Sequence, residues 1–235
     1  ALIPVFDDGA KAHDVSVILA SSPGCLPVEG LEHDERCARF NRRVEQAINP
    51  QAVSDVVLVA RWSLYLYGDV KGDLGHALKS ADGHYDRAGA EQRLADGLRA
   101  RVAQLRAGGH QVWLVKEAPL QAFSPPYRLT RLAMLDRPVD DVGLAFAEHH
   151  KRQAFISQLF AQLAQDPAVH VVDPAPRLCE ASGLCRAERG GYSLYTDDNH
   201  LSEVGARWVA PILEPLFDSL QARANQGKGQ VNASR

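Results

Sequence analysis

The chain has 235 residues, 46% of them hydrophobic, which is enough to bury a sizeable core and predicts a single globular domain. Its 29 acidic and 26 basic side chains leave a net charge of −3, so the composition gives no reason to propose nucleic acid as a partner. No run of about 18 apolar residues is present, so the sequence predicts no membrane-spanning helix.

The four cysteines form two local pairs in the sequence. Cys25 and Cys37 flank one short polar stretch, and Cys179 and Cys185 flank another. Neither pair has C-x-x-C spacing and no histidine accompanies them in a zinc-like pattern, so we expect no metal. We predict two loop-closing disulfides, with free thiols as the alternative, because each loop is short and polar. Disulfides imply an oxidising compartment.

Apolar patterning predicts alternating helices and strands along residues 1–220. Helices are expected over residues 1–13, 37–48, 87–107, 142–165 and 202–220. Pro211 is expected to kink the last of them. Strands are expected over residues 15–20, 56–60, 112–115 and 169–172. A Gly- and Asp-rich loop is expected over 68–85, a Pro-rich loop over 119–126, and a disordered tail over 221–235.

This alternation predicts a flavodoxin-like, three-layer α/β/α fold with a parallel sheet and helices on both faces. Such sheets carry their functional sites at the carboxyl ends of the strands. A fold of this kind normally starts on a buried strand, whereas this chain starts on a helix. We therefore expect the first strand of the sheet to lie outside residues 1–235.

The stretch ahead of the last expected helix carries the clearest chemical pattern, in the sequence Tyr195-Thr-Asp-Asp-Asn-His-Leu-Ser-Glu-Val-Gly205. It places Asp197 three residues before His200, and a carboxylate and an imidazole at this spacing can act as orienting group and base in acyl transfer. Asp73 and His76 share the spacing but lie in the loose Gly-rich loop. The alternative is that Asp197 caps a turn and His200 merely starts a helix.

Two further patterns carry less chemistry. His149 and His150 follow Glu148 without the H-E-x-x-H spacing of a zinc site, which favours a solvated helix face over a metal site. The run from Gly68 to Gly75 lacks a G-K-[ST] ending and is therefore not a phosphate-binding loop.

Residues 194–202, Leu-Tyr-Thr-Asp-Asp-Asn-His-Leu-Ser, resemble the Asp-x-x-His block of SGNH hydrolases. More narrowly, they resemble the SGNH domain fused to membrane-bound acyltransferase-3 proteins, which O-acetylate bacterial surface glycans. Other segments match the same family in the same order, namely Ser22–Pro27, Cys37–Asn41, Val57–Ser63 and Cys179–Cys185. The resemblance covers nearly all of residues 1–220, which would form the SGNH-like domain.

The resemblance implies that Asp197 and His200 are catalytic and that the nucleophile is the serine of a Gly-Asp-Ser-His block at the end of the first strand. No Gly-Asp-Ser occurs in residues 1–235. We therefore expect this serine to lie upstream of Ala1 and the chain to be inactive by itself. Ser22 and Ser63, at the ends of expected strands, are the stand-in candidates.

The resemblance also implies an oxyanion hole, the set of donors that stabilises the transition-state charge. The wider SGNH family uses a glycine amide and the asparagine of a Gly-x-Asn block. Gly24 is the candidate for the first donor. The second departs from the family pattern, because Ala60-Arg-Trp-Ser63 has no asparagine there. Arg61 or Trp62 is then the candidate donor or shapes the sugar site, and the alternative for Trp62 is core packing.

Taken together, the resemblance implies an extracytoplasmic, periplasmic serine-type O-acyltransferase or esterase domain that acts on cell-surface polysaccharide without a cofactor. Its partners would be a glycan, an acyl donor and a membrane acyltransferase module upstream in the same polypeptide, which would tether it to the inner membrane. The alternatives are a stand-alone secreted carbohydrate O-acetyl esterase and a non-catalytic glycan-binding module of the same fold.

Overall fold

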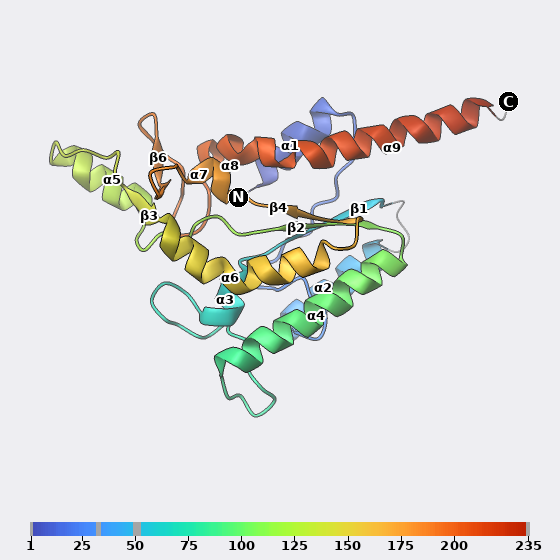
Figure 1. Ribbon diagram of the computed structural model, residues 1–235, viewed down its shortest axis with the longest axis horizontal. Helices are drawn as coiled ribbons and strands as arrows, with labels where there is room; N and C mark the ends of the chain where they lie inside the picture. Colours follow the sequence, from blue (N-terminus) through green and yellow to red (C-terminus); the bar gives the residue numbers. More distant parts are fainter. Residues whose placement is uncertain (1, 32–33, 49–52, 234–235) are drawn as a thin grey trace. The chain divides into compact units, whose positions relative to one another are not determined.

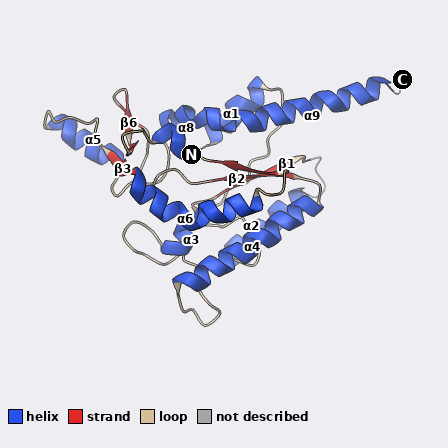
Figure 2. Cartoon of the chain, in the orientation of Figure 1, coloured by secondary structure: helices blue, strands red, loops and turns tan. Residues whose placement is uncertain are grey.

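The structure is a computed structural model that describes residues 2–31, 34–48 and 53–233 (Figures 1 and 2). The chain forms two compact units built from interleaved segments. The sheet unit comprises residues 20–120 and 146–173, and the terminal unit comprises residues 1–19, 121–145 and 174–235. Each unit contains segments from residues 1–220, so the prediction of one domain over this range stays a prediction.

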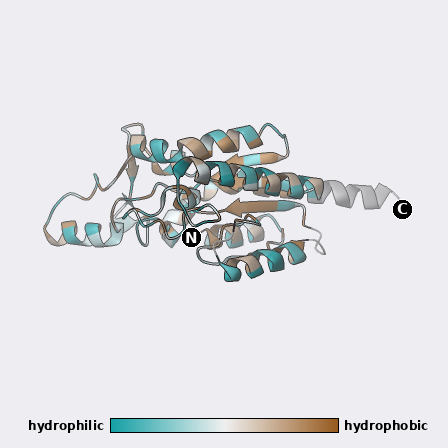
Figure 3. Ribbon diagram, turned by 90° about the horizontal axis from the view of Figure 1, so that it is seen from below, coloured by the Kyte–Doolittle hydropathy of each residue, from teal (hydrophilic) through white to brown (hydrophobic). Residues whose placement is uncertain are grey.

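A three-stranded parallel sheet forms the centre of the sheet unit. Its strands are β1 (Asp55–Val59), β2 (Gln111–Val115) and β4 (Val169–Val172), in the order β1-β2-β4. All three were predicted, because each is a short β-branched apolar run, and they are mostly hydrophobic along their length (Figure 3). The parallel sheet confirms the predicted α/β class.

Four helices of the sheet unit lie on one side of this sheet (Figure 1). They are α2 (Glu35–Ile48), α3 (Trp62–Tyr67), α4 (Arg87–Ala107) and α6 (Phe146–Leu163). Helix α4 has the predicted bounds because both ends carry signals. The Asp86 side chain caps its start by accepting the Gly89 N–H at 2.6 Å, and Gly109 follows its end with φ +83°.

The core of the sheet unit joins one face of the sheet to these helices. Its fully buried side chains include Leu94, Leu98, Val112, Leu114, Ile156 and Phe160. The Trp62 indole packs edge-on against Phe160, with 5.5 Å between ring centroids. Burial of each such side chain contributes about 1.5–3 kcal/mol.

The buried face of α6 changes character along the helix. Its later turns bury Ile156 and Phe160, whereas its first turns bury His149 and Gln153, at 5% and 3% exposure. The prediction of a solvated face is therefore wrong for His149. It fails because only the docking of α6 decides which histidine of the pair turns inward; His150 is exposed.

The terminal unit is mainly helical. Its helices are α1 (Ile3–Ala12), α5 (Pro125–Met134), α7 (Ala175–Leu178), α8 (Glu203–Val209), the 3-10 turn η1 (Ala210–Leu213) and α9 (Glu214–Ala233). Its strands form two small antiparallel pairs, β3 (Gly143–Ala145) with β5 (Leu184–Arg186), and β6 (Glu188–Arg189) with β7 (Tyr192–Ser193). The 3-10 turn at Pro211 confirms the predicted interruption of the last helix.

The structure can be compared with two further expectations, a strand over residues 15–20 and a tail from residue 221. Residues 15–20 were expected to form a strand, but within the described part of the chain they pair with no strand, and Ile18 is 63% exposed. Apolar, β-branched composition does not suffice for a strand, because a strand also needs a neighbour with which to exchange hydrogen bonds. At the other end, α9 extends past residue 221 to Ala233. The disordered tail predicted over residues 221–235 stays a prediction. No proline follows Pro215, so each added residue can extend the helical hydrogen-bond series.

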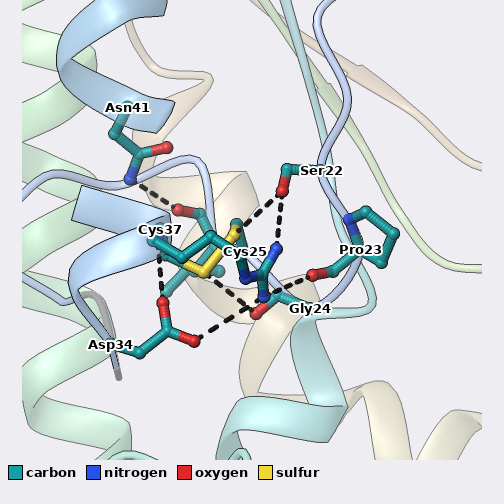
Figure 4. Close-up of a disulfide and its surroundings, with 9 residues drawn as sticks. Ser22, Pro23, Gly24, Cys25, Asp34, Cys37 and Asn41 are labelled. Atoms are coloured by element: carbon teal, nitrogen blue, oxygen red, sulfur yellow. Dashed lines mark hydrogen bonds and ion pairs between the residues drawn. A yellow bond between two sulfur atoms is a disulfide. The ribbon is translucent and has the colours of Figure 1, made fainter. Parts of the chain in front are cut away.

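Both predicted disulfides are present, Cys25–Cys37 in the sheet unit and Cys179–Cys185 in the terminal unit. The first links the Ser22–Cys25 turn to the first turn of α2 (Figure 4). Asp34 accepts the backbone N–H of Cys37 at 2.7 Å and so caps that helix. The disulfide therefore holds the loop that carries Gly24 against a capped helix.

Helix α8 begins with a close backbone approach at Gly205. The Ser202 hydroxyl accepts the Gly205 N–H at 3.0 Å and caps the helix. A Cβ atom on Gly205 would lie 2.0 Å from the carbonyl oxygen of Leu194. Only glycine allows these two segments to meet at this separation.

We predict that Gly205→Ala destabilises the protein by about 3 kcal/mol, because the added methyl must push backbone against backbone. Urea unfolding of both proteins measures the change. Gly75→Ala is the control, since its added methyl would meet only the flexible Asp73 side chain, at 3.3 Å. Equal effects of the two substitutions would contradict the close approach.

We also predict an acid-sensitive contribution from His149, whose burial lowers the pKa from 6.5 to about 4. The unfolded chain takes up a proton below pH 6.5 that the folded chain does not, so the free energy of unfolding falls by about 1.4 kcal/mol per pH unit towards pH 4. His149→Gln should flatten this part of the stability–pH curve, measured by urea unfolding between pH 7 and 4. The exposed neighbour provides a control in His150→Gln, and equal slopes in the two variants would refute the assignment.

Candidate active site

The predicted pair Asp197 and His200 meets in the terminal unit. The Oδ2 atom of Asp197 lies 2.7 Å from Nδ1 of His200. The Oδ1 atom accepts the backbone N–H of His200 at 2.7 Å and that of Asn199 at 2.8 Å. One carboxylate therefore shapes the turn and orients the ring. These contacts fit both interpretations of this stretch, the turn cap and the catalytic pair.

Buried apolar residues anchor this turn on both sides. Tyr195 and Leu201 face each other in an antiparallel bridge and are 1% and 6% exposed. The Thr196 N–H donates to the carbonyl oxygen of His200 at 2.8 Å, which closes the turn. Within the same turn, the backbone oxygen of Asp198 accepts the Gln121 N–H at 2.7 Å. The part-buried Asp197 and the exposed His200 thus project from a fixed base.

The hydrogen bonds around Asp197 favour an ionised carboxylate beside the imidazole ring of His200. Partial burial raises the pKa of Asp197, but the hydrogen bonds from His200 and Asn199 together hold it below its ordinary value. An ionised Asp197 accepts a hydrogen bond from the Nδ1–H group, which leaves Nε2 as the ring nitrogen that can take up a proton. The His200 side chain is 63% exposed, so solutes can approach the ring. This arrangement can accept a proton from a hydroxyl group.

The three predicted oxyanion or substrate residues all lie in the sheet unit. Gly24 has φ +68°, and a Cβ there would lie 2.9 Å from the ring of His76. Trp62 is fully buried, and its indole N–H donates to the carbonyl oxygen of Val115 at 2.8 Å. This geometry fits core packing, the alternative considered for Trp62, and leaves its N–H engaged.

Arg61 differs from Trp62 because it has donors to spare. Its Nε and Nη2 atoms are sheltered from solvent and have no hydrogen-bond partner among the described residues. Arg61 ends the segment after β1, at the carboxyl end of a parallel strand, where α/β folds bind ligands. Sheltered, unused N–H groups on a guanidinium are costly unless a ligand or another group engages them.

Arg61 belongs to a set of polar side chains that sequence analysis did not connect. We call this set the polar layer; it consists of Arg61, Ser63, Glu117, Arg152 and Gln153. Glu117 follows β2 and accepts hydrogen bonds from the Ser63 backbone N–H at 3.3 Å and from the Gln153 amide. Burial raises the pKa of Glu117. The hydrogen bonds that Glu117 accepts and the charges of Arg152 and Arg61 act in the opposite direction, but the effect of burial is larger.

Ser22 and Ser63, the stand-in candidates for the nucleophile, both accept hydrogen bonds from arginines in the sheet unit. The Ser63 hydroxyl is fully buried and accepts from Arg152 Nε at 2.8 Å. The Ser22 hydroxyl accepts from Arg36 Nη1 at 2.8 Å, beside the Cys25–Cys37 disulfide (Figure 4). Neither hydroxyl is paired with a histidine in these contacts.

The competing Asp-x-x-His sequence has a different local structure. Asp73 uses its carboxylate to accept the Gly75 N–H at 2.9 Å. The ring of His76 lies edge-on to Tyr65, with 6.4 Å between centroids. These contacts fit a structured loop.

One set of possible metal ligands occurs among the described residues, formed by His13, Glu214 and Asp218 within 4.8 Å of one another. His13 stacks on Phe217, with ring centroids 5.4 Å apart, and lies 3.5 Å from Glu214. Exposed carboxylates beside a stacked histidine are common without a metal, so this set does not add a metal to the site.

The comparisons with known proteins agree with the predicted fold and family. The family described as "SGNH domain (fused to AT3 domains)" matches residues 1–215. A similar solved structure is that of the periplasmic domain of a lipopolysaccharide acetyltransferase from Salmonella ser. Paratyphi A. It is 14% identical, with a TM-score of 0.63, over 92% of this chain and 78% of that one. A comparison with curated proteins gives no match.

No helix of the described residues is both long enough and apolar enough to cross a bilayer. The family match nonetheless relates the chain to domains that are joined to AT3 domains, and it spans the Asp197–His200 pair and both disulfides. The chain therefore belongs to the SGNH domain family whose members are fused to AT3 domains.

Proposed function

We propose that this chain is the extracytoplasmic part of a serine-type O-acyltransferase or esterase that acts on cell-surface polysaccharide. The observation that carries the proposal is the 2.7 Å contact between Asp197 Oδ2 and His200 Nδ1, held in a turn with anchored flanks. Family membership and the acetyltransferase named by the structural neighbour support the reaction class. Acetyl is the acyl group that this neighbour suggests.

The nucleophile in this proposal is the serine of a Gly-Asp-Ser segment that precedes Ala1. His200 Nε2 takes the serine proton while the serine oxygen attacks the acyl carbon. The imidazolium then returns the proton to the leaving oxygen as its bond to the acyl carbon breaks. In the second step a glycan hydroxyl, or water, gives its proton to Nε2 and takes the acyl group, and the serine recovers its proton. Asp197 stabilises the imidazolium in both steps.

Arg61 is our candidate for the donor that stands where the family has asparagine, and Gly24 for the backbone donor. The support for Arg61 is its two sheltered nitrogens without partners and its position at the carboxyl end of β1. A guanidinium also carries full positive charge, which would stabilise the oxyanion of the tetrahedral intermediate. The indole of Trp62 has no place in this proposal because its N–H is already bonded to Val115.

The cellular setting follows from the same proposal. A membrane acyltransferase module in the same polypeptide would supply the acyl group, and the domain would face the periplasm. The two disulfides support an oxidising compartment, since such bonds persist outside the cytoplasm. The glycan would then be reached at the cell surface.

We predict that a chain extended upstream to include Gly-Asp-Ser hydrolyses 4-nitrophenyl acetate and that residues 1–235 alone do not. In the extended chain, His200→Ala should lower kcat by about 10³-fold, because the serine loses its base. The matched control is His150→Ala, which removes another exposed histidine and should leave kcat unchanged. Hydrolysis by residues 1–235 that His200→Ala abolishes would contradict an upstream nucleophile.

We further predict that Arg61→Met in the extended chain lowers kcat for 4-nitrophenyl acetate by about 10²-fold, as removal of an oxyanion donor does. Stopped assays at saturating ester measure kcat directly. The control Arg99→Met replaces an exposed arginine of α4 and should have no effect. Unchanged ester turnover together with a raised KM for acetylated polysaccharide would show instead that Arg61 binds the sugar.

A further inference from the structure

Helix α5 exposes apolar side chains on the side that a surface helix normally keeps polar. Its inward side buries Pro125 and half-buries two leucines. Its outward side and C-terminal end expose Tyr127 by 71%, Met134 by 81% and Leu135 by 60%. Tyr127 and Met134 are seven residues apart, two helical turns, and so lie on the same side. The outward side is therefore an apolar surface of its own.

The charges beside this surface are all positive along α5. Residues 118–135 contain no aspartate or glutamate, and their only charged side chains are Arg128 and Arg131. Both are exposed, as are Arg137 and one acidic residue, Asp136, just beyond the helix. In the described part of the chain, no carboxylate forms an ion pair with these three arginines. With three arginines and Asp136, residues 118–137 carry a net charge of +2 in a chain whose net charge is −3.

We propose that α5 docks on an anionic lipid surface. In this arrangement Tyr127, Met134 and Leu135 enter the boundary between headgroups and acyl chains, and the arginines contact lipid phosphates. Tyrosine suits this depth because its ring is apolar and its hydroxyl stays in contact with water. Arginine suits the phosphates because its planar guanidinium donates two parallel hydrogen bonds.

A lipid surface explains this helix better than a protein partner does. A specific protein interface buries about 800 Å² on each side, which three side chains on a ten-residue helix do not supply. Binding to a membrane needs no shape complementarity. Exposed apolar groups together with positively charged side chains favour such binding. The inference does not depend on the acyl-transfer chemistry, because none of these residues takes part in it.

The test is sedimentation of residues 1–235 with sucrose-loaded vesicles. The chain should bind vesicles of phosphatidylglycerol and phosphatidylethanolamine and should bind pure phosphatidylcholine at least about tenfold more weakly. Raising the salt concentration from about 0.1 M to 1 M should release it, since the screening length falls from about 10 Å to 3 Å.

Two double variants separate the apolar contribution from the charged one. Met134→Ser with Leu135→Ser should lower the partition coefficient by about tenfold or more. Arg128→Gln with Arg131→Gln should lower it by a similar factor and should also flatten the salt dependence. All four side chains are exposed, so both variants should keep the wild-type circular dichroism spectrum.

The controls change matched residues elsewhere. Ile3→Ser removes an apolar side chain that is 54% exposed, and Arg39→Gln with Arg99→Gln removes two exposed charges from other helices. Both should bind vesicles as the wild type does. Absence of vesicle binding, binding that does not distinguish anionic from neutral lipid, or equal losses in the controls would each overturn the proposal. Absence of vesicle binding is the outcome expected if the surface docks on a protein instead.

Discussion

The geometry of the candidate site depends on a single carboxylate. Asp197 uses one oxygen to hold two backbone N–H groups and the other to hold the ring of His200. Asp197 therefore fixes both the shape of the turn and the direction of the imidazole ring. The turn itself thus orients the imidazole ring, without deep burial of the carboxylate. The buried anchors Tyr195 and Leu201 hold this turn in place within the terminal unit.

The polar layer has a different physical character. It brings two guanidinium groups to one buried carboxyl group at the carboxyl ends of β1 and β2, with Gln153 arriving from α6. Buried groups of this kind cost free energy unless they are fully paired, and here Glu117 Oε2 and Gln153 Oε1 have no partner among the described residues. Proteins keep such unpaired groups mainly where function requires them.

The parts of this fold that the sequence predicts are those decided by neighbouring residues. The three sheet strands and α4 are local patterns with clear ends, and the Asp197–His200 contact spans only three residues. The polar layer depends on which strands lie side by side and on which face of α6 turns inward, so neither composition nor spacing reveals it. Its signal in the sequence was a polar residue within two positions of the end of a predicted strand, Arg61 in one case and Glu117 in the other. Helix α5 was missed because its prolines indicate a loop, although they fit the first turn of a helix equally well.

The unpaired run at residues 15–20 has a consequence for handling the protein. It is six residues long, rich in β-branched side chains and free of charge and proline, which is the composition of segments that stack into intermolecular sheets. In the structure Val17, Ile18 and Leu19 are exposed by 41%, 63% and 53%. The flanking Asp14 and Pro23 oppose such stacking as natural gatekeepers. Self-association of concentrated samples should therefore begin at this run, and a peptide strand that pairs with it should suppress the association.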